Sequence, residues 1–439
     1  MLFKDQKTAL SSLAVLGAGV SGKAVMQWAA EQEIPAVLYD RSGTNGTQAD
    51  FTPSDAAQHD AVVYSPGFPQ EHPWLATARE AGQPCLTEAD FAAGIRPDAF
   101  ANAIAVTGTN GKTTLTEFLA FAHRLSGRNA AAVGNNGIPV TTLLLNAAPQ
   151  TDFPVCEISS FQAECMQYLA PASVLWTNFD EDHLDRHGSA ENYFRAKFRL
   201  VERQLAAQAG GVCVIGESVA EAARRFQIRF PDYTQIATRE EVRHKIPEGS
   251  IFNSFPQSEN YALARRYWLA RGYPIEDLEA AAKQFAPKAH RLARCGVIET
   301  AGMKIDFWND SKGTNFHAVY AALATFPQLP VYWIGGGLGK GGDLGAFCRR
   351  IAPGIRHAAL IGKTAPELSA HLAALGAPAQ VFGTLAEAVH ASFEAALAAK
   401  DPHAVVLFSP GFASFDMFKS YADRGRTFEA LVEALKQKE

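Results

Sequence analysis

The sequence predicts an α/β protein of three domains, each with a mainly parallel sheet flanked by helices. Glycine-rich turns join an apolar strand to a helix near residue 17 and again near residue 108. In the last third of the chain, apolar strands alternate with helices. A length of 439 residues leaves room for several separate cores. The expected domains are residues 1–98, 99–288 and 289–439.

The composition excludes several classes of protein. The net charge is -5 and the sequence shows no basic stripe, which argues against a nucleic-acid partner. The six cysteines form no C-x-x-C pair, so neither a zinc site nor a disulfide framework is expected. The first residues lack the apolar core of a secretion signal, and no apolar run is long enough for a membrane span. We therefore expect a cytoplasmic protein without membrane insertion.

The first domain carries a turn suited to a diphosphate. The glycines fit G-x-G-x-x-G, and an acid ends the next strand, where a ribose-binding acid lies in dinucleotide folds. These residues are Gly17, Gly19, Gly22 and Asp40. Taken alone, the pattern predicts an NAD-dependent dehydrogenase, although any nucleotide-like ligand with a diphosphate can use the same turn. Residues 65–67, Ser-Pro-Gly, follow another strand at the same edge, and residues 94–100 are expected to form a linker.

The central domain begins with a second phosphate-binding turn. Residues 104–106 predict a buried strand, and Lys112 opens a helix after the sequence Gly-Thr-Asn-Gly. Backbone N–H groups and the helix N-terminus would face an anion, Lys112 would add a point charge, and the Thr113 hydroxyl could reach a Mg²⁺. The turn is a shortened form of the P-loop, whose consensus has four residues between Gly and Gly-Lys.

Further polar residues follow the later strands of the central domain. Asn135 lies in a Gly-Asn-Asn-Gly turn, and Glu157 ends a strand, where a carboxylate suits Mg²⁺. The next strand leads into a polar run that includes His183. In the helix after it, Lys197 shares one face with Tyr193, four residues earlier. A lysine that points to a metal site is expected to be neutral or modified.

The last domain is expected to have dinucleotide-like winding. Residues 309–315, Asn-Asp-Ser-Lys-Gly-Thr-Asn, precede an expected helix. The glycine-rich run 335–342 is either a flexible loop or, through Lys340, a clamp for an anionic substrate. A Ser-Pro-Gly-Phe-Ala-Ser motif ends the last apolar strand, and a helix is expected over residues 414–428.

Together, these motifs make the chain similar to the Mur ligase family over essentially its whole length. Seven blocks match family blocks in order: GTNGKTT at 108–114, EISSFQ at 157–162, DEDHLDRH at 180–187, YFRAK at 193–197, HR at 290–291, NDSKGTN at 309–315 and SPGFASFD at 409–416. The resemblance implies a Rossmann-like N-terminal domain for a UDP-linked substrate, a central P-loop ATPase-like domain, and a Rossmann-like C-terminal domain for an amino acid. It also implies a monomer.

The resemblance further implies a reaction. ATP phosphorylates the terminal carboxylate of UDP-N-acetylmuramoyl-L-alanine, and the amine of glutamate attacks the acyl phosphate, in a cytoplasmic step of peptidoglycan precursor synthesis. The products are ADP, phosphate and the UDP-linked alanyl-glutamate, and D-glutamate is the expected isomer. Two Mg²⁺ ions and a carbamylated Lys197 are the expected cofactors beside ATP. Catalysis of this kind relies on positioning and electrostatic stabilisation.

The resemblance assigns a role to each matching residue. The catalytic residues would be Lys112, Asn135, His183 and Lys197. The ATP contacts would be Thr109, Asn110, Gly111, Lys112, Thr113, Thr114, Asn260, Arg291, Asp310 and Lys312. The metal ligands would be Thr113, Glu157, His183 and Lys197. The UDP-substrate contacts would be Gly17, Asp40, Arg41, Ser65, Pro66 and Gly67. The glutamate contacts would be Thr314, Lys340, Ser414 and Tyr421.

The chain departs from the family at several positions. Gly313 stands where Ala is usual, Gly411 and Phe412 replace a small pair, and Tyr421 stands where Phe is common. The segment before Asn260 lacks the family's His-Asn pair. These departures leave L-glutamate open as the substrate. The alternative activities are a folylpolyglutamate synthase, which lacks a UDP-binding first domain, an NAD-dependent oxidoreductase, and a regulatory P-loop NTPase.

Overall fold

The computed structural model describes residues 10–41, 47–207, 211–286, 290–300, 302–339 and 342–437, so Lys340 lies outside the described residues. The chain forms two compact units. The N-terminal unit contains most residues up to 285, and the C-terminal unit contains those from 286 onward. The short segments 182–185 and 254–256 group with the C-terminal unit. The domain limits at residues 98 and 288 stay predictions.

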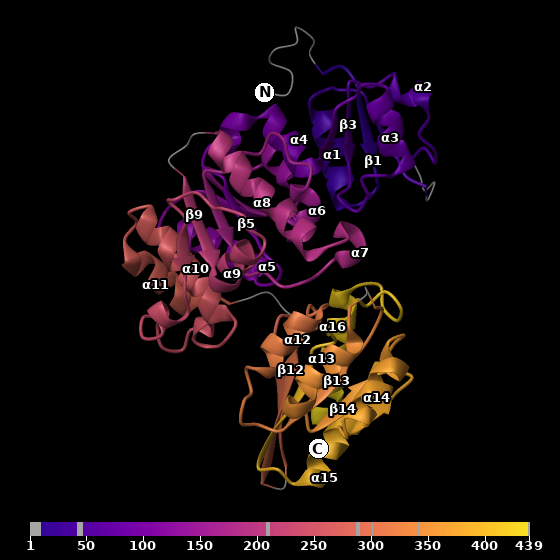
Figure 1. Ribbon diagram of the computed structural model, residues 1–439, viewed down its shortest axis with the longest axis vertical. Coiled ribbons are helices and arrows are strands. Elements are labelled where there is room, and N and C mark those ends of the chain that lie inside the picture. The colour runs from indigo at the N-terminus through magenta and orange to yellow at the C-terminus, as the bar shows by residue number, and fades with distance from the viewer. Residues whose placement is uncertain are drawn as a thin grey trace. The chain divides into compact units, whose positions relative to one another are not determined.

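The N-terminal unit begins with a four-stranded parallel sheet in the order β2-β1-β3-β4 (Figure 1). Its strands are β1 Leu13–Leu16, β2 Ala36–Tyr39, β3 Ala61–Tyr64 and β4 Cys85–Thr87. Its helices are α1 Val20–Glu31, α2 Pro53–Ala56, α3 Pro73–Glu80 and α4 Glu88–Ile95. Every residue of β1 and β3 is buried, as expected for strands in the middle of a parallel sheet.

A six-stranded parallel sheet in the order β10-β9-β8-β5-β7-β6 forms the rest of this unit. Its strands are β5 Ile104–Thr107, β6 Ala130–Gly134, β7 Phe153–Glu157, β8 Ser173–Trp176, β9 Val212–Gly216 and β10 Gln235–Ala237. Its α-helices are α5 Lys112–Leu125, α6 Ser160–Ala163, α7 Leu184–His187, α8 Ala190–Ala206, α9 Glu217–Arg225, α10 Gln257–Ala270 and α11 Ile275–Gln284. Its short 3-10 helices are η1 Pro97–Phe100, η2 Val140–Leu144, η3 Glu240–Val242 and η4 Ile251–Asn253.

Strand alternation divides the apolar side chains of β5 between two cores. Ile104 and Val106 join the core that contains residues of α5, α10 and α11. Ala105 joins the core on the opposite face, which also contains Phe91 of α4 and residues of β1 and β3. One face of the central sheet therefore shares its core with the first sheet. This shared core holds the two sheets together in one unit.

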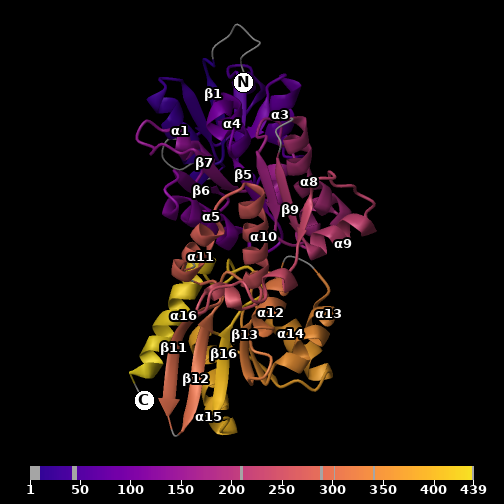
Figure 2. The same cartoon turned by 90° about the vertical axis from the view of Figure 1, so that its left-hand side faces the viewer.

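The C-terminal unit contains a six-stranded sheet in the order β11-β12-β16-β13-β14-β15, and only the β11-β12 pair is antiparallel. Its strands are β11 Ala293–Thr300, β12 Met303–Asn309, β13 Val331–Gly335, β14 His357–Leu360, β15 Ala379–Val381 and β16 His403–Phe408. Its α-helices are α12 Phe316–Leu323, α13 Leu344–Ile351, α14 Ala365–Ala374, α15 Leu385–Ala399 and α16 Tyr421–Lys436, and α16 runs beside β11 (Figure 2).

Two predicted elements are wrong in their limits. The helix predicted over residues 414–428 begins only at Tyr421, because Ser420 adopts an extended conformation and its hydroxyl caps the helix at the Asp423 N–H, 3.1 Å away. The linker predicted over residues 94–100 contains the end of α4 and all of η1. The three-sheet α/β fold class is confirmed.

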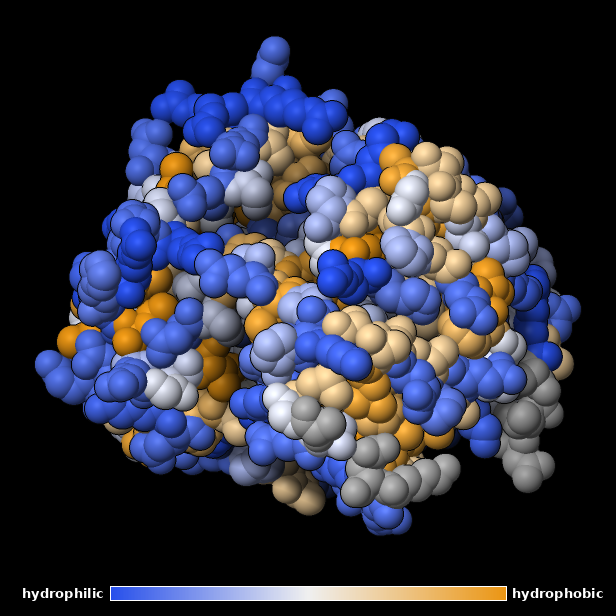
Figure 3. All heavy atoms as spheres, turned by 90° about the horizontal axis from the view of Figure 1, so that it is seen from below, coloured by the Kyte–Doolittle hydropathy of each residue, from blue (hydrophilic) through white to orange (hydrophobic). Residues whose placement is uncertain are grey.

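The surface of the chain is mixed in character. On the face seen in Figure 3, hydrophobic residues lie in small groups between hydrophilic ones, which is ordinary for a folded protein. None of the helices within the described ranges is both long enough and apolar enough to cross a membrane.

Phe118 allows a test of the core that supports α5. It is fully buried, and its ring centroid lies 4.4 Å from that of Phe252 and 5.3 Å from that of Phe285. We expect Phe118→Ala to lower the free energy of unfolding by about 3–5 kcal/mol because it leaves a cavity among aromatic rings. Urea unfolding would measure the loss. The control is Phe415→Ala, at a residue that is 71% exposed, and an equal loss there would contradict the assignment.

Candidate functional site

The phosphate loop, residues 108–114, joins β5 to α5 and is packed closely on both sides. Gly108 and Gly111 have φ values of 145° and 81°, which favour glycine. A Cβ on Gly108 would lie 1.9 Å from the Thr177 hydroxyl oxygen. A Cβ on Gly111 would lie 2.7 Å from the side-chain oxygen of Asn260 in α10. The loop glycines are therefore required by close packing as well as by backbone conformation.

The residues that follow β8 fix the loop by hydrogen bonds. The Thr109 N–H donates to the Asn178 carbonyl at 3.0 Å, and the Asn110 N–H donates to the Asn178 side-chain oxygen at 2.9 Å. The Thr177 hydroxyl donates to the Asn110 carbonyl at 2.6 Å. Thr177 and Asn178 were not among the predicted site residues. Their place directly after a buried strand was the available signal, because β8 is the neighbour of β5.

The N-terminus of α5 has the character of an anion site. Among the described residues, no side chain caps its first turn, so its N–H groups can face a ligand. Thr113 and Thr114, in that turn, are buried. The chain therefore places backbone N–H groups and the positive end of a helix dipole at the predicted position.

Two lysine side chains converge on one carbonyl of the loop. The Lys112 ammonium donates to the carbonyls of Gly108 and Thr109, at 2.8 and 2.7 Å. The Lys197 ammonium donates to the same Gly108 carbonyl at 2.9 Å. Lys197 is only 1% exposed, and its ammonium nitrogen lies 4.6 Å from the centre of the Tyr193 ring. The Lys112 ammonium beside the loop favours an anion there.

Glu157 brings one incompletely paired carboxylate to the same edge. It lies opposite Val106 of β5 and is 2% exposed. Its Oε1 accepts a hydrogen bond from the Asn135 side chain at 3.0 Å, and the Asn135 N–H donates to its carbonyl at 2.9 Å. Its Oε2 has no hydrogen-bond partner among the residues that the structure describes. Because a buried, unpaired carboxylate oxygen is costly, a cation there would be stabilising.

The predicted metal ligands do not all lie in one unit. Thr113, Glu157 and Lys197 belong to the N-terminal unit, whereas His183 lies in the segment that groups with the C-terminal unit. The His183 Nε2 is 3.8 Å from the Asp182 carboxylate. Within the described parts of the chain, no three His, Cys, Asp or Glu side chains form a cluster that could hold a metal. The residues present fit an ion such as Mg²⁺, which takes few protein ligands and keeps water or phosphate oxygens.

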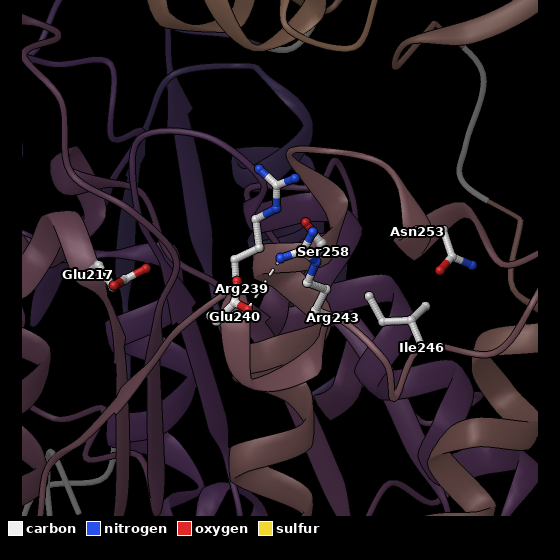
Figure 4. Close-up of a pocket in the computed structure, with 7 residues that line it drawn as sticks. All are labelled: Glu217, Arg239, Glu240, Arg243, Ile246, Asn253 and Ser258. Atoms are coloured by element: carbon white, nitrogen blue, oxygen red, sulfur yellow. Dashed lines mark hydrogen bonds and ion pairs between the residues drawn. The ribbon is translucent and has the colours of Figure 1, made fainter.

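A hollow of about 440 Å³ lies at the ends of β9 and β10, beside α10 (Figure 4). It is lined by Glu217, Arg239, Glu240, Arg243, Ile246, Asn253 and Ser258. Ser258 is 4% exposed, and its hydroxyl has no hydrogen-bond partner within the described ranges. Burial, together with the charge of Glu217, raises the pKa of neighbouring Glu259 to about 6. Because Asn260 on the same helix contacts Gly111, the hollow lies close to the phosphate loop.

The predicted UDP-substrate residues meet at the ends of β1, β2 and β3. Gly17 has a φ of 104°, and a Cβ there would lie 3.1 Å from the Ser65 Cβ. The Asp40 carboxylate accepts a hydrogen bond from the Ala18 N–H at 2.8 Å, so it also holds the glycine turn. The Arg41 guanidinium lies 5.6 Å from the centre of the Trp74 ring. Trp74 was not among the predicted site residues.

The C-terminal unit holds residues 309–315 in a buried polar network. The Asp310 carboxylate accepts hydrogen bonds from the Ser409 hydroxyl at 2.7 Å and from the Leu292 N–H at 3.1 Å. Burial raises the Asp310 pKa to about 7, although the Ser409 hydrogen bond opposes this rise. Buried Arg424 donates to the Ser311 carbonyl at 2.9 Å and to the Phe412 carbonyl at 3.1 Å.

Tyr421, a predicted glutamate residue, contacts the same network. The Lys312 ammonium lies 4.1 Å from the centre of the Tyr421 ring, and the Tyr421 carbonyl accepts a hydrogen bond from the Ser311 hydroxyl at 2.8 Å. Ser414 is buried. Leu338, in the glycine-rich run before Lys340, exchanges backbone hydrogen bonds of 2.9 and 3.1 Å with Ala413. The described part of the run is thus paired, and the prediction for Lys340 falls outside the described residues.

The departures at Gly313 and Gly411 contact each other. The Gly411 N–H donates to the Gly313 carbonyl at 2.9 Å. Gly411 has a φ of 78°, and a Cβ there would lie 2.9 Å from a methyl group of Val319. A Cβ on Gly313 would lie 2.4 Å from the Asp310 carboxylate. The two glycines therefore belong to one close-packed arrangement.

Comparison with known proteins gives consistent results along the chain. A family model described as the Mur ligase middle domain matches residues 106–248. A UDP-N-acetylmuramoylalanine-D-glutamate ligase of Geobacter metallireducens is 34% identical over 400 residues, which cover 87% of this chain and 85% of that protein. The ligase of the same name from Gloeobacter violaceus is 32% identical over 457 residues, 97% of this chain and 100% of that protein.

Solved structures share the fold at low identity. The UDP-N-acetylmuramate-alanine ligase of Thermotoga maritima has a TM-score of 0.60 and 16% identity, and the match covers 98% of this chain and 100% of that one. A folylpolyglutamate synthase of Mycobacterium tuberculosis has a TM-score of 0.56 and 13% identity, and the match covers 77% of this chain and 94% of that one.

The raised pKa of Asp310 predicts a pH dependence of stability. Its ordinary value is 3.8 and its value in the folded chain is about 7. The stabilising effect of the protonated form is complete below pH 4 and is lost as the pH rises to 7, an effect on the order of a few kcal/mol. We therefore compare the difference in melting temperature, wild type minus Asp310→Asn, at two pH values. We expect this difference to be lower at pH 8 than at pH 5. An equal difference at both pH values would contradict the assignment.

Proposed function

The chain belongs to the Mur ligase family and is an ATP-dependent ligase, and from this premise we propose that it joins glutamate to UDP-N-acetylmuramoyl-L-alanine. The expected isomer is D-glutamate, the amino acid in the names of the relatives. The observation that carries the proposal is the phosphate loop with Lys112 and Lys197 on the Gly108 carbonyl. The step belongs to peptidoglycan precursor synthesis, and we place the enzyme in the cytoplasm as a monomer.

The chemistry follows from the poor reactivity of a carboxylate. Transfer of the ATP γ-phosphate to the terminal carboxylate of the UDP-linked substrate gives an acyl phosphate and ADP. The amine of glutamate then attacks the acyl carbon, and phosphate leaves. Negative charge develops on the phosphoryl and acyl oxygens, so fixed positive charges and N–H donors lower the barrier.

The phosphate loop would bind ATP through Thr109, Asn110, Gly111, Lys112, Thr113 and Thr114. N–H groups at the N-terminus of α5 would donate hydrogen bonds to the phosphate oxygens. Lys112 donates to two loop carbonyls in this structure, so its ammonium would turn from them toward the phosphates. Asn260, which packs on Gly111, would contribute from α10. From the C-terminal unit, Arg291, Asp310 and Lys312 would complete the nucleotide contacts.

Two Mg²⁺ ions would be held by Thr113, Glu157, His183 and Lys197. When bound, they would neutralise charge on the phosphates. The fit rests on Glu157, whose Oε2 lacks a hydrogen-bond partner in the described chain. The Lys197 ammonium would repel such an ion, whereas its carbamate would be an anion and would keep one N–H for the Gly108 carbonyl. Asn135 would orient Glu157 and assist at the acyl group.

The two other substrates would bind at the remaining predicted residues. The UDP-linked substrate would bind at the strand ends that carry Gly17, Asp40, Arg41, Ser65, Pro66 and Gly67. Glutamate would bind at Thr314, Lys340, Ser414 and Tyr421. Gly313 and Gly411, which depart from the usual family pattern, would give the glutamate pocket a different wall. The preferred isomer therefore needs a direct test.

A phosphate-release assay tests the proposed reaction. We expect phosphate to form from ATP only when UDP-N-acetylmuramoyl-L-alanine and D-glutamate are both present. L-glutamate should give a much smaller rate, and the opposite result would correct the isomer. Phosphate release that does not need the acceptor would contradict the ligase assignment and favour a P-loop NTPase.

Replacing Lys197 tests the carbamate. We expect Lys197→Ala to lose activity by on the order of 100-fold, because a charge that orders the site is removed. Acetate or formate should restore part of the rate by replacing the anionic carbamate. The control is Lys112→Ala, which lacks a cation and should not respond to either anion. If Lys197→Ala is not restored, or both variants respond equally, carbamylation is contradicted.

A further inference from the structure

The C-terminal unit contains a buried contact that fixes the predicted nucleotide-binding carboxylate. Ser409 follows β16, Asp310 follows β12, and these two strands are neighbours. Ser409 is fully buried and Asp310 is 9% exposed. The Ser409 hydroxyl donates to Asp310 Oδ2 at 2.7 Å. The contact is therefore sheltered from water, where a hydrogen bond to a carboxylate is strong.

The other oxygen of Asp310 holds an unusual stretch of backbone. Its Oδ1 accepts the Leu292 N–H at 3.1 Å, and the Lys312 N–H donates to the His290 carbonyl at 3.0 Å. His290 and Leu292 have φ values of 65° and 48°, which non-glycine residues adopt at a cost. Arg291 lies between them. The conformation of the Arg291 backbone thus depends on the orientation of the Asp310 carboxylate.

Gly313 makes room for this contact. A Cβ at residue 313 would lie 2.4 Å from Asp310 Oδ2 and 3.0 Å from the Ser409 hydroxyl oxygen. Neither atom belongs to the free end of a long side chain, so neither can move away easily. In this chain, the carboxylate and the hydroxyl occupy the space that a side chain at residue 313 would fill.

We propose that Ser409 is a positioning residue for nucleotide binding: its hydroxyl orients the Asp310 carboxylate, and through Leu292 it orients Arg291. The proposal rests on the proposed function only in taking Asp310 and Arg291 as nucleotide contacts. Ser409 itself touches no substrate in this scheme. Burial favours the protonated form of Asp310 and raises its pKa, whereas the Ser409 hydrogen bond and the charges of Arg291 and Arg424 favour the carboxylate.

Ser409→Ala is the direct test. We expect the KM for ATP to rise on the order of 10-fold, because a buried hydrogen bond to a carboxylate is lost. The values of KM for the UDP-linked substrate and for glutamate should stay within about twofold. In wild type, the KM for ATP should fall as the pH rises and Asp310 ionises. In Ser409→Ala this fall should occur at a higher pH, because the carboxylate loses a donor that lowers its pKa. The matched control is Ser392→Ala in α15, a buried serine whose hydroxyl has no partner among the described residues.

A second variant separates positioning from simple damage to the fold. Ser409→Thr keeps a hydroxyl that can donate to Asp310, so it should recover most of the ATP binding that Ser409→Ala loses. Equal losses in Ser409→Thr and Ser409→Ala, an unchanged KM for ATP in Ser409→Ala, or an equal rise of KM for all three substrates would overturn the proposal. Near-wild-type melting temperatures would show that the variants fold.

Calorimetric binding of ADP separates this proposal from the proposed function. If wild type binds ADP but ligates nothing, the proposed reaction fails, and weaker ADP binding by Ser409→Ala still supports the positioning role. If wild type ligates and Ser409→Ala binds ADP as wild type does, only the positioning role fails. A wild-type chain that binds no ADP overturns both.

Discussion

The carbonyl oxygen of Gly108 is the contact on which the rest of the site depends. It accepts hydrogen bonds from two lysine side chains, and the Gly108 Cα packs closely against Thr177. Gly108 therefore connects the end of β5, the start of α5 and helix α8 through its carbonyl, and packs on the residues after β8. Any residue larger than glycine at this position would clash with Thr177. The Lys112 ammonium gives the loop an attraction for polyanions.

Around this carbonyl, the chain leaves polar groups incompletely paired where a ligand would bind. Within the described ranges, the first turn of α5 has no side-chain cap, and Glu157 has one carboxylate oxygen without a partner. Burial makes both features costly in the free chain. Bound phosphates and a divalent cation would satisfy both, so binding energy is available for ordering the substrates.

In the C-terminal unit, by contrast, the polar groups near residue 310 are already paired with one another. Ser409 pairs with Asp310, and Arg424 pairs with the carbonyls of Ser311 and Phe412. Gly313 and Gly411 allow this close packing because neither position has space for a side chain. A network of this kind holds one arrangement of its side chains. It suits the role that we propose for these residues in binding a nucleotide and an amino acid.

The sequence by itself determined the α/β class and the phosphate loop, because apolar runs and glycine spacing are local properties of a chain. It also placed Glu157 and Asn135 at one sheet edge, since the ends of parallel strands share an edge. The prediction of a helix over residues 414–420 was wrong. Only the tertiary structure decided the contacts between distant segments: Asn178 on the loop, and Ser409 on Asp310. Such contacts depend on which strands are neighbours, and strand order is set by packing of the whole sheet.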